Sequence, residues 1–277
     1  MVKKTTVIIG PTASGKSKRS IAMAQAMEAA VISADAFQIY RDFNIGTGTL
    51  STQDMAGVPH YLVSERHPET PYCVDEFIKN VANITRDHPD QPLIICGGSA
   101  MYLKALLYSY RPLKRCPDHQ RPQGTPNELW HQLHAIDPVL AQKTHPNNHR
   151  RVQRYLELAI LYNRPPSELF KSTPINPHQY DIIGISIERS TLKTMINHRI
   201  DGMIQDGLVD EVRELMKRYS IDSPAFHAIG YRDVVAYLNQ TITEDKMIDS
   251  IKTTTYRYAK RQMTWFRTFD HVHWQHQ

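Results

Sequence analysis

Short apolar runs along the chain alternate with longer segments in which apolar residues recur at helical spacing. The apolar runs are Thr6–Ile9, Ala30–Ser33, Pro92–Cys96 and Tyr180–Ile187. Such unbroken runs are typical of strands that are buried on both faces of a parallel sheet. Helices are predicted at Lys18–Ala29, Ala100–Leu107, Thr191–Gln205 and Thr243–Arg267. Strands that alternate with helices in this way predict an α/β fold with a parallel sheet and right-handed crossovers.

The first predicted strand leads into a glycine-bounded loop whose residue order is that of a phosphate-binding loop. The loop is Gly10-Pro11-Thr12-Ala13-Ser14-Gly15-Lys16-Ser17, and the first helix follows it. Inward-facing backbone N–H groups and the positive end of the helix predict a site for a polyphosphate. Lys16 is expected to reach the outer phosphate and Ser17 to ligate Mg²⁺. A plain glycine-rich turn is the alternative, but the flanking strand and helix favour a P-loop NTPase-like core.

The ends of the next two strands carry side chains that suit the same site. Asp35 and Gln38 follow the second strand, and Gly97-Gly98-Ser99 follows the third. Ligands bind beyond the carboxyl ends of parallel strands, so these residues are expected in one crevice with the P-loop. Gly98 and Ser99 open a helix and offer a second anion-binding helix start. The structural alternatives are a turn residue for Asp35 and an N-cap for Ser99.

Two later helices carry basic residues whose placement needs an explanation. Arg199 lies within the apolar stripe of the helix Thr191–Gln205, where an unpaired charge would be costly. Its side chain either extends to the rim or pairs with an anionic ligand. On the last helix, basic residues alternate with aromatic ones, as suits RNA contact, although a solvated helix has the same composition. Those basic residues are Arg257, Lys260 and Arg261.

Between these elements the composition changes, which predicts a small inserted domain. A proline-rich segment, Arg111–Pro126, is predicted to be an exposed loop, and a second break spans Pro165–Pro177. Short helices are predicted between the breaks at Asn127–His134, Pro138–Lys143 and Asn147–Leu161. We therefore expect a core of residues 1–110 and 172–277 with a helical insertion at 111–171. At the other end of the chain, His271, His273 and His276 are expected to form a frayed tail.

Composition narrows the class of protein only modestly. The 277 residues, 41% of them hydrophobic, are enough for one α/β core with an insertion. Lys and Arg exceed Asp and Glu by 33 to 28, a mild excess that fits an anionic partner but does not require one. Cys73, Cys96 and Cys116 have no metal or redox spacing, which fits thiols of a reducing cytoplasm. No apolar run is long enough to span a membrane, and no signal peptide is recognised.

Taken together, the motifs resemble those of the tRNA dimethylallyltransferases, also called tRNA isopentenyltransferases, nearly from end to end. Besides the P-loop, the resemblance rests on several segments in a fixed order. These are residues 33–41, Ile45-Gly46-Thr47, Val58–Leu62, Tyr72–Phe77, Gly97–Tyr102, His145-Pro146-Asn147, Gly207–Val212, Ala228–Tyr231 and Tyr258–Arg267. The absence of a zinc-finger extension is typical of the bacterial members.

This resemblance implies transfer of a dimethylallyl group from its diphosphate to the exocyclic amine of the adenosine 3′ of the anticodon in tRNA. The P-loop and Gly98 would hold the diphosphate with Mg²⁺, and Lys16 and Arg199 would stabilise its charge. By the family's pattern, Asp35 takes the proton of the amine and Ser99 assists the leaving diphosphate. Gln38 would hold bases of the anticodon loop, and the basic residues of the insertion and the last helix would bind tRNA. The insertion contributes Arg150, Arg151 and Arg154. A cytoplasmic monomer without membrane contact is expected.

Several departures from the family pattern leave alternatives open. Thr49-Leu50 replaces a usual Lys-Pro, Met195 and Tyr256 stand at frequent Arg positions, and the insertion is short. These losses favour a related prenyltransferase that acts on free adenine nucleotides, whereas the retained basic clusters favour tRNA. A P-loop kinase for small molecules and an RNA-binding relative without catalysis are further alternatives. Gly97-Gly98-Ser99 argues against the kinase, and retention of Lys16 and Asp35 argues against loss of catalysis.

Overall fold

The computed structural model describes residues 5–108, 117, 120–169 and 179–277. The chain forms two compact units, one of Met1–Leu107 with Ile175–Gln277 and one of Tyr108–Pro174. The first unit is the α/β core, and the second contains only helices and turns among its described residues. Most of the predicted loop 111–126 and of the break 165–177 lies outside the described residues.

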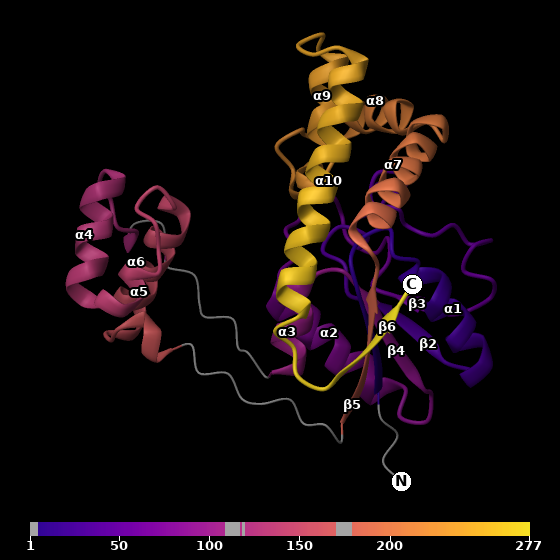
Figure 1. Cartoon of the computed structure of the whole chain (residues 1–277), viewed down its shortest axis with the longest axis horizontal. Coiled ribbons are helices and arrows are strands. Elements are labelled where there is room, and N and C mark those ends of the chain that lie inside the picture. The colour runs from indigo at the N-terminus through magenta and orange to yellow at the C-terminus, as the bar shows by residue number, and fades with distance from the viewer. Residues whose placement is uncertain (1–4, 109–116, 118–119, 170–178) are drawn as a thin grey trace. The chain divides into compact units, whose positions relative to one another are not determined.

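A six-stranded sheet organises the core unit, and the strand pairs are parallel, as predicted (Figure 1). The strand order is β3-β2-β4-β1-β5-β6. The strands are β1 Thr5–Ile9, β2 Ala30–Ser33, β3 His60–Tyr61, β4 Leu93–Gly97, β5 Tyr180–Ser186 and β6 Val272–His276. The strand that precedes the P-loop is thus paired with β4 on one side and β5 on the other. Its central position brings the P-loop beside the loops that follow β4 and β5.

Helices cover the sheet and extend beyond the carboxyl ends of its strands. These helices are α1 Lys16–Met27, α2 Val74–Asp87, α3 Ala100–Leu107, α7 Arg189–Gln205, α8 Leu208–Arg218, α9 Tyr231–Leu238 and α10 Glu244–Phe266. Ile8, Val31 and Ile94 of the sheet pack with Ala24 of α1 in one buried cluster. Figure 1 shows α7, α8, α9 and α10 gathered beyond the strand ends, with α10 running back toward α3. The helices predicted from the sequence include α1, α3, α7 and α10 but leave out α2, α8 and α9.

The carboxyl-terminal segment is a strand, so the prediction of a frayed histidine tail is wrong. Residues Val272–His276 form β6, which pairs in parallel with β5 along the edge of the sheet. Gly184 of β5 lies opposite Trp274, and a Cβ at Gly184 would meet the side chains of both Val272 and Trp274. The side chains of Val272 and Trp274 therefore pack on the sheet, while His273 and His276 are exposed.

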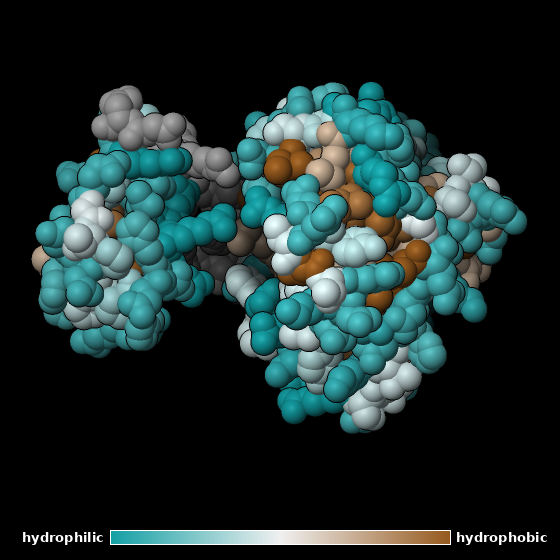
Figure 2. Space-filling view, turned by 90° about the horizontal axis from the view of Figure 1, so that it is seen from above, coloured by the Kyte–Doolittle hydropathy of each residue, from teal (hydrophilic) through white to brown (hydrophobic). Residues whose placement is uncertain are grey.

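The second unit has its own small core. Its helices are α4 Pro126–Ile136, α5 Pro138–Gln142 and α6 His149–Tyr162, followed by the 3-10 turn Pro166–Glu168. Leu129, Leu133 and Leu156 are buried together. Thr125 and Glu128 form a reciprocal cap at the start of α4, and Asp137 caps α5 while also accepting a hydrogen bond from Ser167 N. Figure 2 shows largely hydrophilic residues on the visible face of this unit and several hydrophobic patches on that of the core.

Two further observations concern the predictions from composition. Cys73 is exposed, Cys96 is buried, and Cys116 lies outside the described residues. None of the described helices combines the length and the apolar character that would let it cross a membrane.

Candidate active site

The P-loop turns into α1 at Gly15, where the backbone has a left-handed conformation. Gly15 has a φ of 73° and precedes the first residue of α1, and Ala13 also has a positive φ of 62°. Glycine takes such angles without a steric penalty, which explains Gly15 at the turn into the helix. The Ser14 hydroxyl is buried and has no hydrogen-bond partner among the described residues. An unpartnered buried hydroxyl inside a loop of this kind suits an anionic ligand.

Two cations lie at the P-loop. The Lys16 ammonium donates a 2.6 Å hydrogen bond to the Pro11 carbonyl. The pKa of Lys16 is lowered to about 8, mainly by burial and also by the positive charge of Arg199, whereas Cys96 and Asp35 act in the opposite direction. Burial also lowers the pKa of Arg199, and the charge of Asp35 opposes that shift. These mutual effects indicate that the charges of Lys16, Arg199 and Asp35 lie within electrostatic reach of one another.

Within the described residues, the guanidinium of Arg199 has neither a hydrogen bond nor an ion pair with a carboxylate. It lies against Gly48, where a Cβ would overlap Nη2 of Arg199. The side chain is half-buried, so the predicted alternatives of a rim position and a ligand partner are both compatible with its placement. An arginine in this state favours an anion in the cavity that it borders.

Asp35 and Ser99 are held rigidly by backbone groups of the loop after β2. The Asp35 carboxylate accepts hydrogen bonds through Oδ1 from Phe37 N at 2.9 Å and Gln38 N at 3.4 Å. The Ser99 hydroxyl accepts one from Ala36 N at 3.0 Å. Asp35 is thus a turn residue, which is the alternative named for it, whereas the Ser99 hydroxyl bonds to the loop after β2 and not to an N–H group at the start of α3. The bracing also fixes where a ligand would meet them.

The side chain of Gln38 is engaged inside the protein. Its amide oxygen accepts a 3.0 Å hydrogen bond from the Ser33 hydroxyl, and its amide nitrogen donates to the Gly48 carbonyl at 3.1 Å. It also donates to the Thr47 carbonyl at 3.4 Å. Gln38 thus holds the segment that lies against Arg199. This structural role differs from the contact with tRNA bases that was expected from the sequence.

The segment 44–46 is fastened by a residue that the sequence analysis does not assign to the site. Glu211 of α8 accepts hydrogen bonds from the backbone N–H groups of Asn44, Ile45 and Gly46, at 3.0, 2.7 and 3.3 Å. Its carboxylate also accepts a 2.7 Å hydrogen bond from the Tyr231 hydroxyl. Glu211 therefore fixes the stretch that leads to Gly48.

Helix α10 contributes two further residues that were not assigned to the site. Gln262 accepts a hydrogen bond from Thr12 N and donates one to the Gly98 carbonyl. The Tyr258 hydroxyl donates to the same carbonyl at 3.4 Å, and burial followed by the charge of Asp35 raises the pKa of Tyr258. Tyr258 and Gln262 are one helical turn apart on α10. This spacing is the sequence signal that could have indicated that they lie on the same face of the helix.

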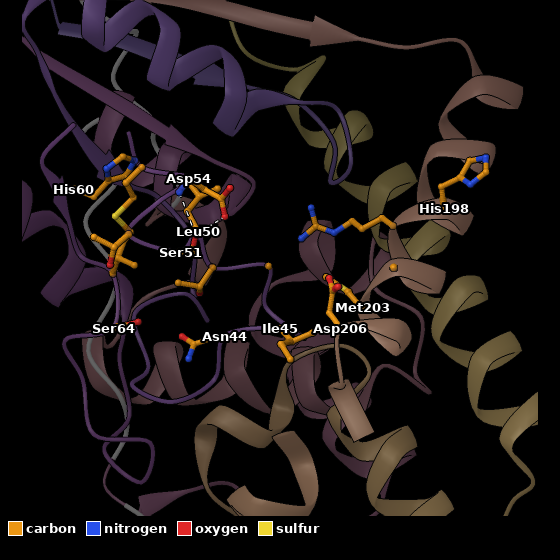
Figure 3. Close-up of a pocket in the computed structure, with 17 residues that line it drawn as sticks. Asn44, Ile45, Leu50, Ser51, Asp54, His60, Ser64, His198, Met203 and Asp206 are labelled. Atoms are coloured by element: carbon orange, nitrogen blue, oxygen red, sulfur yellow. Dashed lines mark hydrogen bonds between the residues drawn. The ribbon is translucent and has the colours of Figure 1, made fainter. Parts of the chain in front are cut away.

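A cavity of about 960 Å³ is lined by Gly48 and Arg199 and is bordered by the segment 44–64 and by α7. Figure 3 shows Leu50, Ser51 and Asp54 facing Met203 and Asp206 across it. A smaller hollow lined by Ser17 and Gln38 shares four residues with this cavity. The shared residues are Leu50, Met55, His60 and Val63. Apolar side chains thus lie between the start of α1 and the larger cavity.

The basic residues predicted to bind RNA fall on both units. Arg257, Lys260 and Arg261 are exposed on α10 of the core. Arg150 and Arg151 are exposed on α6 of the helical unit. Arg154 instead forms a 3.0 Å ion pair with Glu157, which also pairs with Arg121 at 3.3 Å. Among the described residues, no group of three or more His, Cys, Asp or Glu side chains could hold a metal ion.

The sequence and the fold are both similar to those of known transferases. A family model described as IPP transferase matches residues 38–269. A tRNA dimethylallyltransferase from Geobacillus thermodenitrificans is 37% identical over 99% of this chain and 90% of its own length. The full-length tRNA isopentenylpyrophosphate transferase of Bacillus halodurans is 35% identical, with a TM-score of 0.73, over 99% of this chain and 90% of its own.

A eukaryotic dimethylallyltransferase acting on tRNA has a TM-score of 0.82 and 28% identity, over 95% of this chain and 70% of its own. The matches to the Geobacillus and Bacillus proteins include the strands, the P-loop and the helices that build the site described above, because each covers 99% of this chain. On this similarity of sequence and fold, the chain belongs to the IPP transferase family.

Proposed function

We propose that the protein transfers a dimethylallyl group from dimethylallyl diphosphate to the exocyclic amine of the adenosine 3′ of the anticodon in tRNA. The observation that carries this proposal is that the P-loop, Asp35 and Ser99 follow three neighbouring strands, β1, β2 and β4, while α7 holds the Arg199 guanidinium against Gly48. Membership of the IPP transferase family supports the same reaction, since the relatives are named tRNA dimethylallyltransferases.

The P-loop is proposed to bind the diphosphate of the donor. The loop offers backbone N–H groups, the Ser14 hydroxyl, which has no partner among the described residues, and the Lys16 ammonium. The residues proposed to surround the diphosphate are Gly10, Ala13, Ser14, Gly15, Lys16 and Ser17. Gly98 and the Arg199 guanidinium border the site from two other elements. The apolar residues Leu50, Met55 and Val63 lie near Ser17 and suit the hydrocarbon part of the donor. A site that is cationic at one end and apolar at the other fits a prenyl diphosphate.

In the proposed reaction the allylic C–O bond of the donor breaks and a C–N bond to the adenine amine forms. Negative charge develops on the departing diphosphate, where Lys16 and Arg199 stabilise it. The amine loses one proton, which the Asp35 carboxylate accepts as general base. Ser99 can donate its hydroxyl hydrogen to the diphosphate while its oxygen accepts from Ala36 N. Atoms and charge balance with prenylated adenosine, diphosphate and the proton taken up by Asp35 as products.

Mg²⁺ fits the donor set at the start of α1. The Ser17 hydroxyl is half-buried there, and Mg²⁺ typically takes one or two protein oxygens together with phosphate oxygens and water. Ser17 would hold the ion, which would neutralise charge on the diphosphate when bound.

The acceptor is proposed to be the anticodon loop of tRNA, with the target adenosine turned out of its stack. Arg257, Lys260 and Arg261 of the core supply exposed cations for its phosphates, as do Arg150 and Arg151 of the helical unit. We place this activity in the cytoplasm and expect the protein to act as a monomer.

Labelled dimethylallyl diphosphate offered with tRNA, AMP or ATP tests the proposal. We expect label in tRNA alone, located at the adenosine 3′ of the anticodon. Label in AMP or ATP would instead identify a prenyltransferase for free nucleotides, the alternative favoured by Thr49, Met195 and Tyr256. Hydrolysis of ATP with phosphorylation of a small molecule would identify a kinase.

Asp35→Asn tests the base within the same assay. The amide oxygen keeps the hydrogen bonds from Phe37 N and Gln38 N, while the capacity to accept a proton is lost. Transfer should fall by about 10²–10⁴-fold with tRNA affinity unchanged. Asp87→Asn, an identical change at an exposed carboxylate, is the matched control. Full activity of Asp35→Asn would exclude Asp35 as the base.

A further inference from the structure

One side chain of α10 spans the two loops that build the anion site. Gln262 is 3% exposed, and both ends of its amide are used. Thr12 N donates to its Oε1 at 2.8 Å, and its Nε2 donates to the Gly98 carbonyl at 2.9 Å. Thr12 follows β1 and Gly98 follows β4, and these two strands are neighbours in the sheet. One amide thus links the P-loop to the loop that carries Ser99.

The surroundings of Gln262 are shaped to fit this amide. The two hydrogen bonds of the Gln262 amide, to Thr12 N and to the Gly98 carbonyl, are called the Gln262 bridge below. A Cβ at Gly98 would overlap Nε2 of Gln262, so the absence of a side chain at Gly98 makes room for this bridge. Thr12 N, which the sequence analysis assigns to the diphosphate, is directed to Gln262 instead. The Tyr258 hydroxyl reaches the same Gly98 carbonyl from the preceding turn of α10.

We propose that Gln262 is a positioning residue that sets the separation between the P-loop and the Gly97–Ser99 loop. A primary amide presents an acceptor oxygen and donor N–H groups on one planar group, so one side chain can bond to an N–H group and to a carbonyl at once. With the bridge intact, the diphosphate held by the P-loop meets the Ser99 hydroxyl and the Asp35 carboxylate in one arrangement. This inference deepens the proposed function and rests on it, because it concerns the same site.

Loss of the bridge should affect diphosphate binding and turnover more than RNA binding. Gln262→Met keeps the length of the side chain but removes both hydrogen bonds. Affinity for inorganic pyrophosphate, measured by titration calorimetry, should fall by about tenfold, and kcat by about 10–100-fold. The affinity for tRNA should stay within about twofold, because the basic side chains of α10 are exposed whereas Gln262 is buried.

Thr264→Ala is the matched control for Gln262→Met. Thr264 is exposed on the same helix, and its hydroxyl bonds only to the Lys260 carbonyl of that helix. Its pyrophosphate affinity and kcat should equal those of the wild type. Unchanged pyrophosphate affinity and kcat in Gln262→Met would overturn the proposal. So would an equal loss of pyrophosphate affinity, tRNA affinity and folded protein, since that pattern indicates a purely structural residue.

Gln262→Glu provides a readout that a merely structural role would not change, and it remains informative if Gln262→Met does not fold. A protonated Glu has the donor and acceptor of Gln, whereas the carboxylate lacks the donor to the Gly98 carbonyl. The pyrophosphate affinity of Gln262→Glu relative to wild type should therefore rise as the pH falls from about 8 to about 5.5. The charged and titratable groups nearby are Asp35, Lys16, Tyr258 and Arg261. Both proteins contain these groups, so their own titration affects both affinities and is removed when the affinity of the variant is divided by that of the wild type.

A ratio that does not change with pH would overturn the role of the bridge. Pyrophosphate binding needs no acceptor, so these outcomes stay separate from a failure of the proposed function. A wild-type protein that binds pyrophosphate but prenylates no tRNA would refute the function and leave the test of Gln262 intact.

Discussion

At the scale of the residue, the protonation of Lys16 controls how the site responds to pH. With a pKa of about 8, set mainly by burial, the ammonium loses its proton well below the ordinary value of 10.5. Between these two values the unfolded chain binds more protons at this residue than the folded chain. Its contribution to folding stability therefore rises with pH in that window. Below pH 8 the charged, buried ammonium costs stability that an anionic ligand can offset.

Diphosphate binding should consequently weaken above pH 8. We expect the dissociation constant for pyrophosphate to rise by up to about tenfold per pH unit there, with proton uptake on binding. Calorimetry between pH 7 and 9.5 in two buffers of different ionisation enthalpy measures both quantities. Lys16→Met, which cannot titrate, reports the ionisation of pyrophosphate itself. If the variant and the wild type have the same pH dependence, Lys16 is not the titrating group.

The contact between Gly48 and Arg199 gives a second prediction at this scale. Gly48 has a φ of 63°, and an added Cβ would overlap the Arg199 guanidinium. Gly48→Ala should displace that guanidinium and raise KM for dimethylallyl diphosphate by about tenfold. Gly57→Ala is a matched control, because Gly57 has a φ of 78° and no atom within 4 Å of an added Cβ.

Both alanine variants should lose about 1 kcal/mol of unfolding free energy from the positive φ. Only Gly48→Ala should change KM. If the two variants share one KM, Arg199 does not depend on the Gly48 contact for its position.

At the scale of the element, Glu211 holds the segment 44–46 to α8. Glu211→Gln keeps the size of the side chain but replaces one acceptor oxygen by a donor that faces N–H groups or the Tyr231 hydroxyl. The free energy of unfolding in urea should fall by about 1–3 kcal/mol, and KM for the prenyl donor should rise as Gly48 loses its support. Glu214→Gln on the exposed side of the same helix should change neither quantity measurably. Equal stability of the two variants would mean that the segment keeps its conformation without Glu211.

Elements that depend on local sequence were predictable, and those that depend on distant partners were not. The apolar runs predicted β1, β2, β4 and β5, and the P-loop order predicted the turn at Gly15. β6 was missed because its five residues include two histidines and a glutamine, and its place in the sheet depends on the room above Gly184.

The same limit applies to the site. Asp35 and Ser99 lie just after β2 and β4, and Lys16 ends the loop after β1, so a parallel sheet predicts that they share one edge. Gln262 and Glu211 bond to backbone groups that lie 250 and 166 residues away, at Thr12 and Ile45. A backbone partner can belong to any residue type and leaves no pattern in the sequence. Helical spacing places Gln262 beside Tyr258, but it does not indicate what the pair touches.

At the scale of the whole molecule, the arginines of the helical unit fall into two groups, exposed ones and one that is paired inside the unit. On α6, Arg150 and Arg151 are exposed, whereas Arg154 is paired with Glu157, whose side chain is only 10% exposed. An arginine committed to a nearly buried carboxylate contributes to the fold of its unit. Exposed arginines on the same helix remain available to phosphate. The sequence groups these three arginines together, but neutralising Arg150 and Arg151 should have a different effect from neutralising Arg154.

The double variant Arg150→Gln with Arg151→Gln should weaken tRNA binding and reduce the slope of log affinity against log salt by about 1.5, because each lost phosphate contact removes about 0.7–0.9. Its thermal stability should equal that of the wild type, since both side chains are exposed. Arg154→Gln should instead leave the salt slope unchanged and cost about 1 kcal/mol of stability, because Glu157 loses one of its two cations. Filter binding of tRNA across a salt series, with thermal unfolding of each variant, measures both effects. A reduced salt slope in Arg154→Gln at full stability would assign Arg154 to the RNA and leave Arg121 as the cation that matters to Glu157.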